Sequence, residues 1–108
     1  MTWEPITLTD LVVEIGRGVQ QMSAEELALW RRIRLEPSKW ACEPWGDEGG
    51  GFWVVATVGQ YVVRFNDIED GFNVSPFTNH GVIDDYWCNQ DELHWVVHRL
   101  VERGHATR

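Results

Sequence analysis

The side chains best suited to nucleophilic chemistry lie near the end of the chain. Cys88 stands just before an apolar, periodic stretch that contains His94 and His98. A thiol close to a helix N-terminus can have its pKa lowered, and a neighbouring histidine can act as its base. One hypothesis is therefore a small hydrolase or transferase that uses Cys88 with one of these histidines. The sequence has no GxSxG motif and no Rossmann glycine pattern, so we assign no catalytic residue and favour a function other than catalysis.

Metal chemistry has weak support in the sequence. His94 and His98 are four residues apart and would share one face of a helix, but two histidines supply only half of a tetrahedral site. The acid-rich segment 66–73 (NDIEDGFN) invites comparison with an EF-hand loop. With Gly71 at the required sixth position, however, Ile68 stands where an oxygen ligand belongs. We therefore predict no metal site and no cofactor, and we interpret the segment as a turn with solvated acids.

The negative charge of the chain is concentrated in its middle. The net charge is −8, and residues 40–92 carry ten acids against a single base, Arg64, whereas the remaining residues sum to +1. Lysine and arginine are what neutralise the phosphates of nucleic acids and of anionic lipids, so direct binding to nucleic acid or to a membrane surface is disfavoured. A basic protein partner is favoured instead.

Tryptophan is the residue type that most suggests a binding surface. The chain has seven, and tryptophan is a frequent anchor of protein interfaces, above all where carboxylates nearby can meet lysine or arginine of a partner. We predict a non-enzymatic binding protein, of the immunity or inhibitor type, that engages a basic protein such as a toxin or nuclease with a nucleic-acid-binding cleft. The predicted binding residues are Trp45, Asp47, Glu48, Trp53, Asp67, Glu69, Asp70, Asp84 and Asp85. A small-molecule pocket lined by tryptophan is a further alternative.

Helices are expected on both sides of this acidic stretch. The first is predicted over residues 8–19, with Thr7 and Asp10 as its capping box. The second runs from Ser23, which forms a capping box with Glu26, to the Glu36-Pro37 pair. Apolar residues recur in both with helical spacing.

The last helix is the most regular element of the sequence. Asn89 and Glu92 are expected to form its cap, and an apolar stripe continues to Val101 before Gly104 ends the helix. The stretch 38–51 has four glycines and no periodicity, so it is predicted to be a loop.

Between these helices the pattern alternates with a period of two. In FWVVATVGQYVVRF (residues 52–65), Gly59-Gln60 fits a two-residue type II′ turn. This turn places Val54 opposite Phe65 and gives one apolar face that helices must cover. Two weaker runs complete the predicted sheet, residues 72–75 and residues 81–83.

The predicted fold is α+β in a single domain, 1–108: two N-terminal helices, a four-stranded antiparallel meander and a C-terminal helix packed on one face of the sheet. The start, MTWEPITLTD, has neither the basic opening nor the apolar stretch of a secretory signal, and no apolar run approaches the roughly 20 residues that span a bilayer. A cytoplasmic location is expected, with Cys42 and Cys88 as free thiols.

Three stretches, GGGFWVVA, NDIEDGFN and YWCNQDEL, resemble small uncharacterised acidic bacterial proteins of about this length, and the likeness spans most of the chain. This resemblance implies no activity and assigns no functional residue. In size and acidity the chain is also similar to the immunity proteins that neutralise bacterial toxins, which is a likeness of type without a diagnostic motif.

Overall fold

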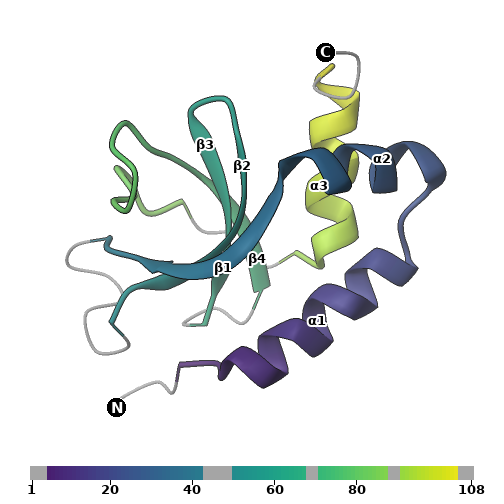
Figure 1. Ribbon diagram of the computed structural model, residues 1–108. Coiled ribbons are helices and arrows are strands. Elements are labelled where there is room, and N and C mark those ends of the chain that lie inside the picture. Colours follow the sequence, from purple (N-terminus) through teal and green to yellow (C-terminus); the bar gives the residue numbers. More distant parts are fainter. Residues whose placement is uncertain (1–4, 43–49, 68–70, 88–90, 105–108) are drawn as a thin grey trace.

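The computed structural model describes residues 5–42, 50–67, 71–87 and 91–104. Within these residues, two helices precede a four-stranded antiparallel sheet and a third helix packs on it, which confirms the predicted fold (Figure 1). The elements, in chain order, are α1 (Leu8–Gln20), α2 (Ala24–Ile33), β1 (Arg34–Trp40), β2 (Phe52–Val58), β3 (Tyr61–Asn66), β4 (Gly71–Pro76) and α3 (Leu93–Glu102). The helices lie on one side of the sheet, whose strands follow the order β1-β2-β3-β4. None of the helices in the described part of the chain has the length and apolar content needed to cross a membrane.

The first two helices begin where their capping residues predict. At α1, the Thr7 hydroxyl accepts a hydrogen bond from the backbone N–H of Asp10, with 3.1 Å between nitrogen and oxygen. At α2, Ser23 and Glu26 form a complete capping box, in which each side chain accepts the backbone N–H of the other residue. These bonds satisfy N–H groups that have no partner inside the helix.

The third helix begins later than predicted. Its N-cap is Glu92, whose backbone is extended (φ −69°, ψ 151°) and whose side chain makes no capping hydrogen bond. The prediction that Glu92 lies inside the helix as a reciprocal cap is therefore wrong, and its expected partner Asn89 lies outside the described residues. The reason is a contact with the sheet: the Phe72 N–H donates to the Asp91 carbonyl at 2.8 Å, in an isolated bridge that keeps the chain extended up to Glu92.

One strand, β1, was not predicted. It follows α2 without a loop, so the helix ends earlier than the expected stop at Glu36-Pro37, and residues 38–40 are strand rather than loop. The register of β1 against β2 shifts between Arg34 and Ser38, around Pro37. A proline and a bulge are tolerated here because an edge strand has one side without ladder hydrogen bonds.

The run 81–83 does not join the sheet, so its prediction as the fourth strand is wrong. Val82 forms only an isolated parallel bridge with Ala41, and the N–H of Ile83 donates to the Ala41 carbonyl at 2.7 Å. The sheet therefore has the predicted number of strands with one different member, β1.

A bulge in β2 changes the pairing predicted from the turn. The expected register holds from Val58 to Ala56 and then shifts, so that Val54 lies opposite Arg64 rather than Phe65. The prediction for Val54 is wrong because the bulge adds one residue to β2 without adding one to β3.

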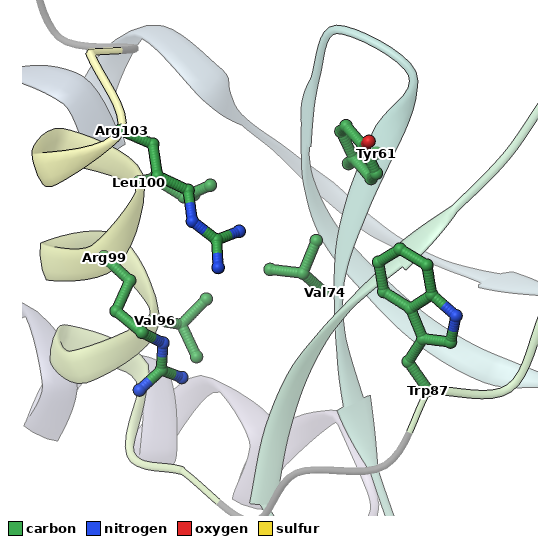
Figure 2. A pocket seen from close by; sticks show the side chains of 7 residues that line it. All are labelled: Tyr61, Val74, Trp87, Val96, Arg99, Leu100 and Arg103. Atoms are coloured by element: carbon green, nitrogen blue, oxygen red, sulfur yellow. The ribbon is translucent and has the colours of Figure 1, made fainter.

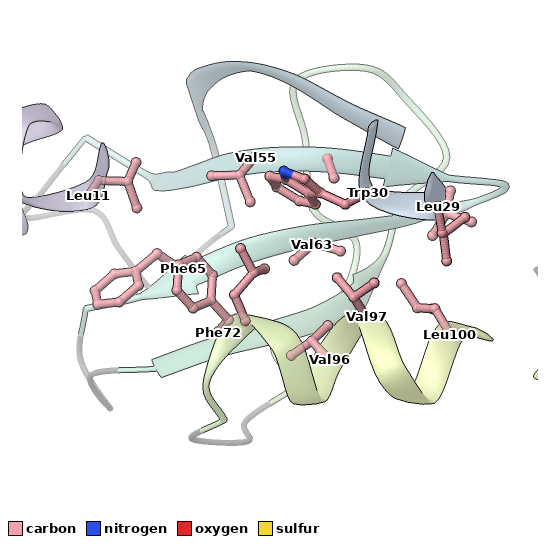
Figure 3. Packing of buried hydrophobic residues seen from close by; sticks show 13 residues of the cluster. Leu11, Leu29, Trp30, Val55, Val63, Phe65, Phe72, Val96, Val97 and Leu100 are labelled. Carbon is pink, nitrogen blue, oxygen red and sulfur yellow. The ribbon is translucent and has the colours of Figure 1, made fainter. Parts of the chain in front are cut away.

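This bulge divides the apolar residues of β2 between two cores. Val55 belongs to the cluster beneath the helices, together with Val96 and Val97 of α3 (Figure 3). Val54 belongs to a second cluster on the other face, which the segment 77–87 covers through residues such as Ile83. Because both faces are buried, the central strands are almost continuously apolar.

Candidate functional site

Five of the nine predicted binding residues lie outside the described residues. These are Trp45, Asp47, Glu48, Glu69 and Asp70. The other four occupy two different places in the fold.

Trp53 and Asp67 meet at the N-terminal segment. The Trp53 indole nitrogen donates to the Ile6 carbonyl at 3.1 Å, and the Ile6 N–H donates to the Asp67 carboxylate at 3.0 Å. The Lys39 ammonium also lies 5.0 Å from the centre of the Trp53 ring. Burial raises the pKa of Asp67, although the hydrogen bond from Ile6 works in the opposite direction. Both residues therefore anchor the chain ahead of α1 to the end of the sheet.

Asp84 and Asp85 lie in the exposed part of the segment 77–87, on the sheet face opposite the helices. Asp84 accepts a hydrogen bond from the Thr78 hydroxyl at 2.6 Å, and Asp85 accepts one from the indole nitrogen of Trp87 at 3.1 Å. The structure thus brings Trp53 and Asp67 together at the N-terminal segment. Asp84 and Asp85 lie elsewhere, in the segment 77–87 on the opposite face of the sheet.

A different set of acids surrounds a hollow of about 690 Å³ beside α1. Asp10 and Glu14 come from one face of α1, and Asp91 and Glu92 come from the residues just before α3. Among the described lining residues, Arg17 is the only base. We call this hollow the acidic groove.

The floor of the acidic groove is apolar and is set by the packing of α1 against α3. Phe65, Phe72 and Leu93 line it, and all three are buried. Gly18 makes this packing possible, because a Cβ atom at that position would lie only 2.6 Å from the Cβ of Leu93. The bridge between Phe72 and Asp91 then holds the start of α3 against the sheet.

The acids of the groove differ in their ion-pair partners. Glu14 forms an exposed ion pair with Arg17 at 3.0 Å, and Asp91 forms a half-buried ion pair with Arg99 at 2.6 Å. Glu92 is largely exposed, 3.7 Å from His94, at the N-terminus of α3, where the helix dipole favours a carboxylate. An exposed pair such as Glu14 with Arg17 is worth only about 0–1 kcal/mol, so it can be exchanged for a contact with a cationic ligand.

Two of these acids were not recognised as site residues in the sequence because they fall in its first third, where acids and bases nearly balance. Asp10 and Glu14 are four residues apart, which places them on the same helix face. This spacing is the signal that could have found them. Asp91 and Glu92 were counted in the acidic stretch, but their position beside α1 depends on the tertiary fold.

One histidine of α3, His98, contacts α2. His98 lies with Nδ1 2.7 Å from a carboxylate oxygen of Glu26, which is only 8% exposed. Burial acts to raise the pKa of Glu26, but the hydrogen bond from the Ser23 backbone and the interaction with His98 outweigh it, and the pKa is lowered. Within the described ranges no three potential metal ligands are grouped, and Cys88 lies outside them.

Carboxylates around an apolar floor can hold a long cationic side chain. The methylene groups of lysine or arginine pack on apolar surface, while the charged end meets carboxylate oxygens. The acidic groove offers both features within one hollow. Comparisons of the chain with protein-family models, with curated proteins and with solved structures found no match.

Proposed function

We propose that this protein binds a basic protein partner and that the acidic groove receives lysine or arginine side chains of that partner. The observation that carries the proposal is the convergence of Asp10 and Glu14 with Asp91 and Glu92 around one apolar floor. The sequence alone favours the same class of partner, because the net charge is −8. A toxin or nuclease with a basic nucleic-acid-binding cleft is the partner class we propose.

Binding of this kind has two separable contributions. The overall negative charge speeds the encounter with a basic protein, and this effect weakens as salt screens it. Burial of the apolar floor and of the cationic side chain then slows dissociation. Asp67, which anchors the N-terminal segment, and Asp84 and Asp85, on the sheet face opposite the helices, do not line this groove, so the proposal does not depend on them.

The test first captures a basic partner from cell extract at low salt and purifies it. The affinity of this partner for defined variants of the protein is then measured by titration. Glu92→Lys reverses a charge in the acidic groove, and Glu25→Lys makes the same change at an exposed position on α2. We expect Glu92→Lys to weaken binding by about tenfold or more, equivalent to about 1.4 kcal/mol. Asp10→Lys should act in the same way.

The control variant Glu25→Lys should change affinity much less, and the affinity of the wild type should fall steadily between low and physiological salt. Equal losses in Glu92→Lys and Glu25→Lys would mean that only net charge matters. Affinity that does not change with salt would contradict the proposal altogether.

A further inference from the structure

A second hollow, of about 300 Å³, lies between α3 and the strands β3 and β4 (Figure 2). Tyr61 and Trp87 stand on its strand side, and Arg99 and Arg103 stand on its helix side. None of its described lining residues is acidic, in a chain whose net charge is −8. The hollow is therefore a locally cationic place, opposite in character to the acidic groove.

The aromatic side of this hollow is exposed, and one of its two rings, that of Trp87, is anchored by hydrogen bonds. The rings of Tyr61 and Trp87 have centroids 6.0 Å apart and planes inclined by 37°, and the two residues are 39% and 42% exposed. The Trp87 indole nitrogen donates to Asp85, and the Trp87 carbonyl accepts a hydrogen bond from the buried Arg64 at 2.7 Å. The Trp87 ring is thus held in place from behind, which lowers the entropic cost of binding a ring against it.

The cationic side is formed by two arginines one turn apart on α3. Asp91 binds Arg99 at 2.6 Å and neutralises it in part. Arg103 is exposed and has no ion-pair partner among the residues that the structure describes. Figure 2 shows its guanidinium group extended from α3 across the hollow toward Val74. This group is placed to bind an anion.

The floor between the two sides is apolar. Val74 of β4 and Val96 and Leu100 of α3 form it. The volume is at the lower end of the range of small-molecule sites, about 300–1,000 Å³, so it has room for a ring system with one anionic group.

We propose that this hollow binds a small planar anion, with its aromatic ring against Trp87 and Tyr61 and its carboxylate or phosphate group on Arg103. Offset stacking on aromatic side chains recognises the ring, and the guanidinium recognises the anion through paired hydrogen bonds. This site goes beyond the proposed function, because its ligand carries the opposite charge and contacts other residues.

The experiment titrates the whole chain with two ring-bearing anions, adenosine monophosphate and indole-3-acetate, and follows the indole N–H signals of the tryptophans by NMR. Trp87→Phe assigns the Trp87 signal. We expect at least one of the two probes to saturate with a Kd below about 1 mM, roughly 4 kcal/mol of binding free energy, and to shift the Trp87 signal. The Trp95 signal should not move, because that exposed tryptophan of α3 does not line the hollow. Binding of only the first probe assigns a phosphate ligand, and binding of only the second a carboxylate ligand.

Two sets of controls separate this site from nonspecific binding. Adenosine has the ring without the anion and inorganic phosphate has the anion without the ring, so each should bind at least about tenfold more weakly. Arg103→Gln should weaken the ring-bearing anion about tenfold, whereas Arg31→Gln, at an exposed position on α2, should leave it unchanged. Failure of both probes to saturate, shifts confined to other tryptophans, or equal affinity in Arg103→Gln and the wild type would overturn the proposal.

Discussion

Glu26 connects α2 with α3. Its carboxylate caps α2 through the Ser23 N–H and also contacts His98 of α3 at 2.7 Å. Because it is nearly buried, the ionised carboxylate is stable only while both partners are in place. His94 adds a weaker electrostatic contribution in the same direction.

The lowered pKa of Glu26 predicts how stability depends on pH. Its contribution is complete above the ordinary glutamate pKa of about 4.3 and is lost as pH falls through the lower pKa of the folded state. Glu26→Gln keeps an oxygen for the Ser23 N–H but loses the charge, so it should be about 1.5–3 kcal/mol less stable at pH 7. Denaturant unfolding from pH 7 to pH 3 checks this, because the difference between variant and wild type should narrow as pH falls.

The neighbouring variant Glu25→Gln is the matched control. Glu25 is exposed, and among the described residues the hydrogen bond from α2 to His98 of α3 is made by Glu26 instead. Replacing Glu25 should therefore change stability by no more than about 0.5 kcal/mol. A gap between Glu26→Gln and the wild type that stays constant over the acid range would show that the ionised form of Glu26 is not the stabilising one.

At the scale of elements, two glycines of α1 have opposite roles. Glycine inside a helix is unfavourable relative to alanine, so each needs a structural reason. Gly16 is exposed, and a Cβ atom built there meets nothing within 4 Å. Gly18 is buried, and its Cβ would collide with the side chain of Leu93. Only the second glycine is required for the contact between α1 and α3.

Alanine substitution at these two positions should therefore change stability in opposite directions. Gly16→Ala should stabilise by about 0.5–1 kcal/mol, because it removes only the conformational cost of glycine. Gly18→Ala should destabilise by about 1–3 kcal/mol, because α1 must move away from Leu93. Thermal unfolding of both variants measures the difference. Equal effects would contradict the close approach of the helices.

The same close approach sets the width of the acidic groove, since Asp10 and Glu14 stand on α1 and Glu92 stands at the start of α3. Gly18→Ala is expected to disturb partner binding as well as stability, while Gly16→Ala leaves both the groove and its acids in place. The shape of the acidic groove thus depends on how α1 packs against α3, and not only on its acidic side chains.

At the scale of the whole molecule, Arg64 joins the sheet to the segment that covers its second face. Its side chain is fully buried, donates to the Ser75 hydroxyl and to the Trp87 carbonyl, and stacks 4.6 Å from the centre of the Phe52 ring. Tyr86 lies on the guanidinium as well, at 5.0 Å. One cation therefore contacts two aromatic rings and links the sheet to this segment.

Removing Arg64 should loosen this layer. Arg64→Met leaves the buried acceptors on Ser75 and Trp87 without their donor, and a loss of about 2–4 kcal/mol is expected. Denaturant unfolding measures it, and the NMR signal of the Trp87 indole should shift because its backbone anchor is gone. Arg31→Met, at an exposed position, should stay within about 0.5 kcal/mol of the wild type. Unchanged stability in Arg64→Met would contradict the anchoring role.

Local patterns in the sequence were enough to predict most of the elements. Capping residues gave the starts of α1 and α2, and the Gly59-Gln60 turn gave the hairpin of β2 and β3 together with its first pairs. These features depend on neighbours within a few residues, so their physical causes are contained in the local sequence.

The strand β1, the bulge in β2 and the late start of α3 were missed because each depends on a distant partner. Residues 34–40 contain a proline and lack alternation, and they become a strand only because β2 offers an edge to pair with. Arg64 appeared in the sequence as the one base of an acidic stretch, and no local pattern indicated that Arg99 and Arg103 would line a common hollow. Their functional interpretation changed once the fold placed them.

The sequence by itself determined the α+β class, the helical and hairpin segments and the excess of negative charge, because composition and short-range spacing encode these properties. Only the tertiary structure decided which charges share a surface. It brought Asp10 beside Glu92 and Trp87 opposite Arg103, residues that are far apart along the chain. The physical reason is that side chains from separate elements meet only after their apolar faces have packed, and that packing is a property of the whole chain.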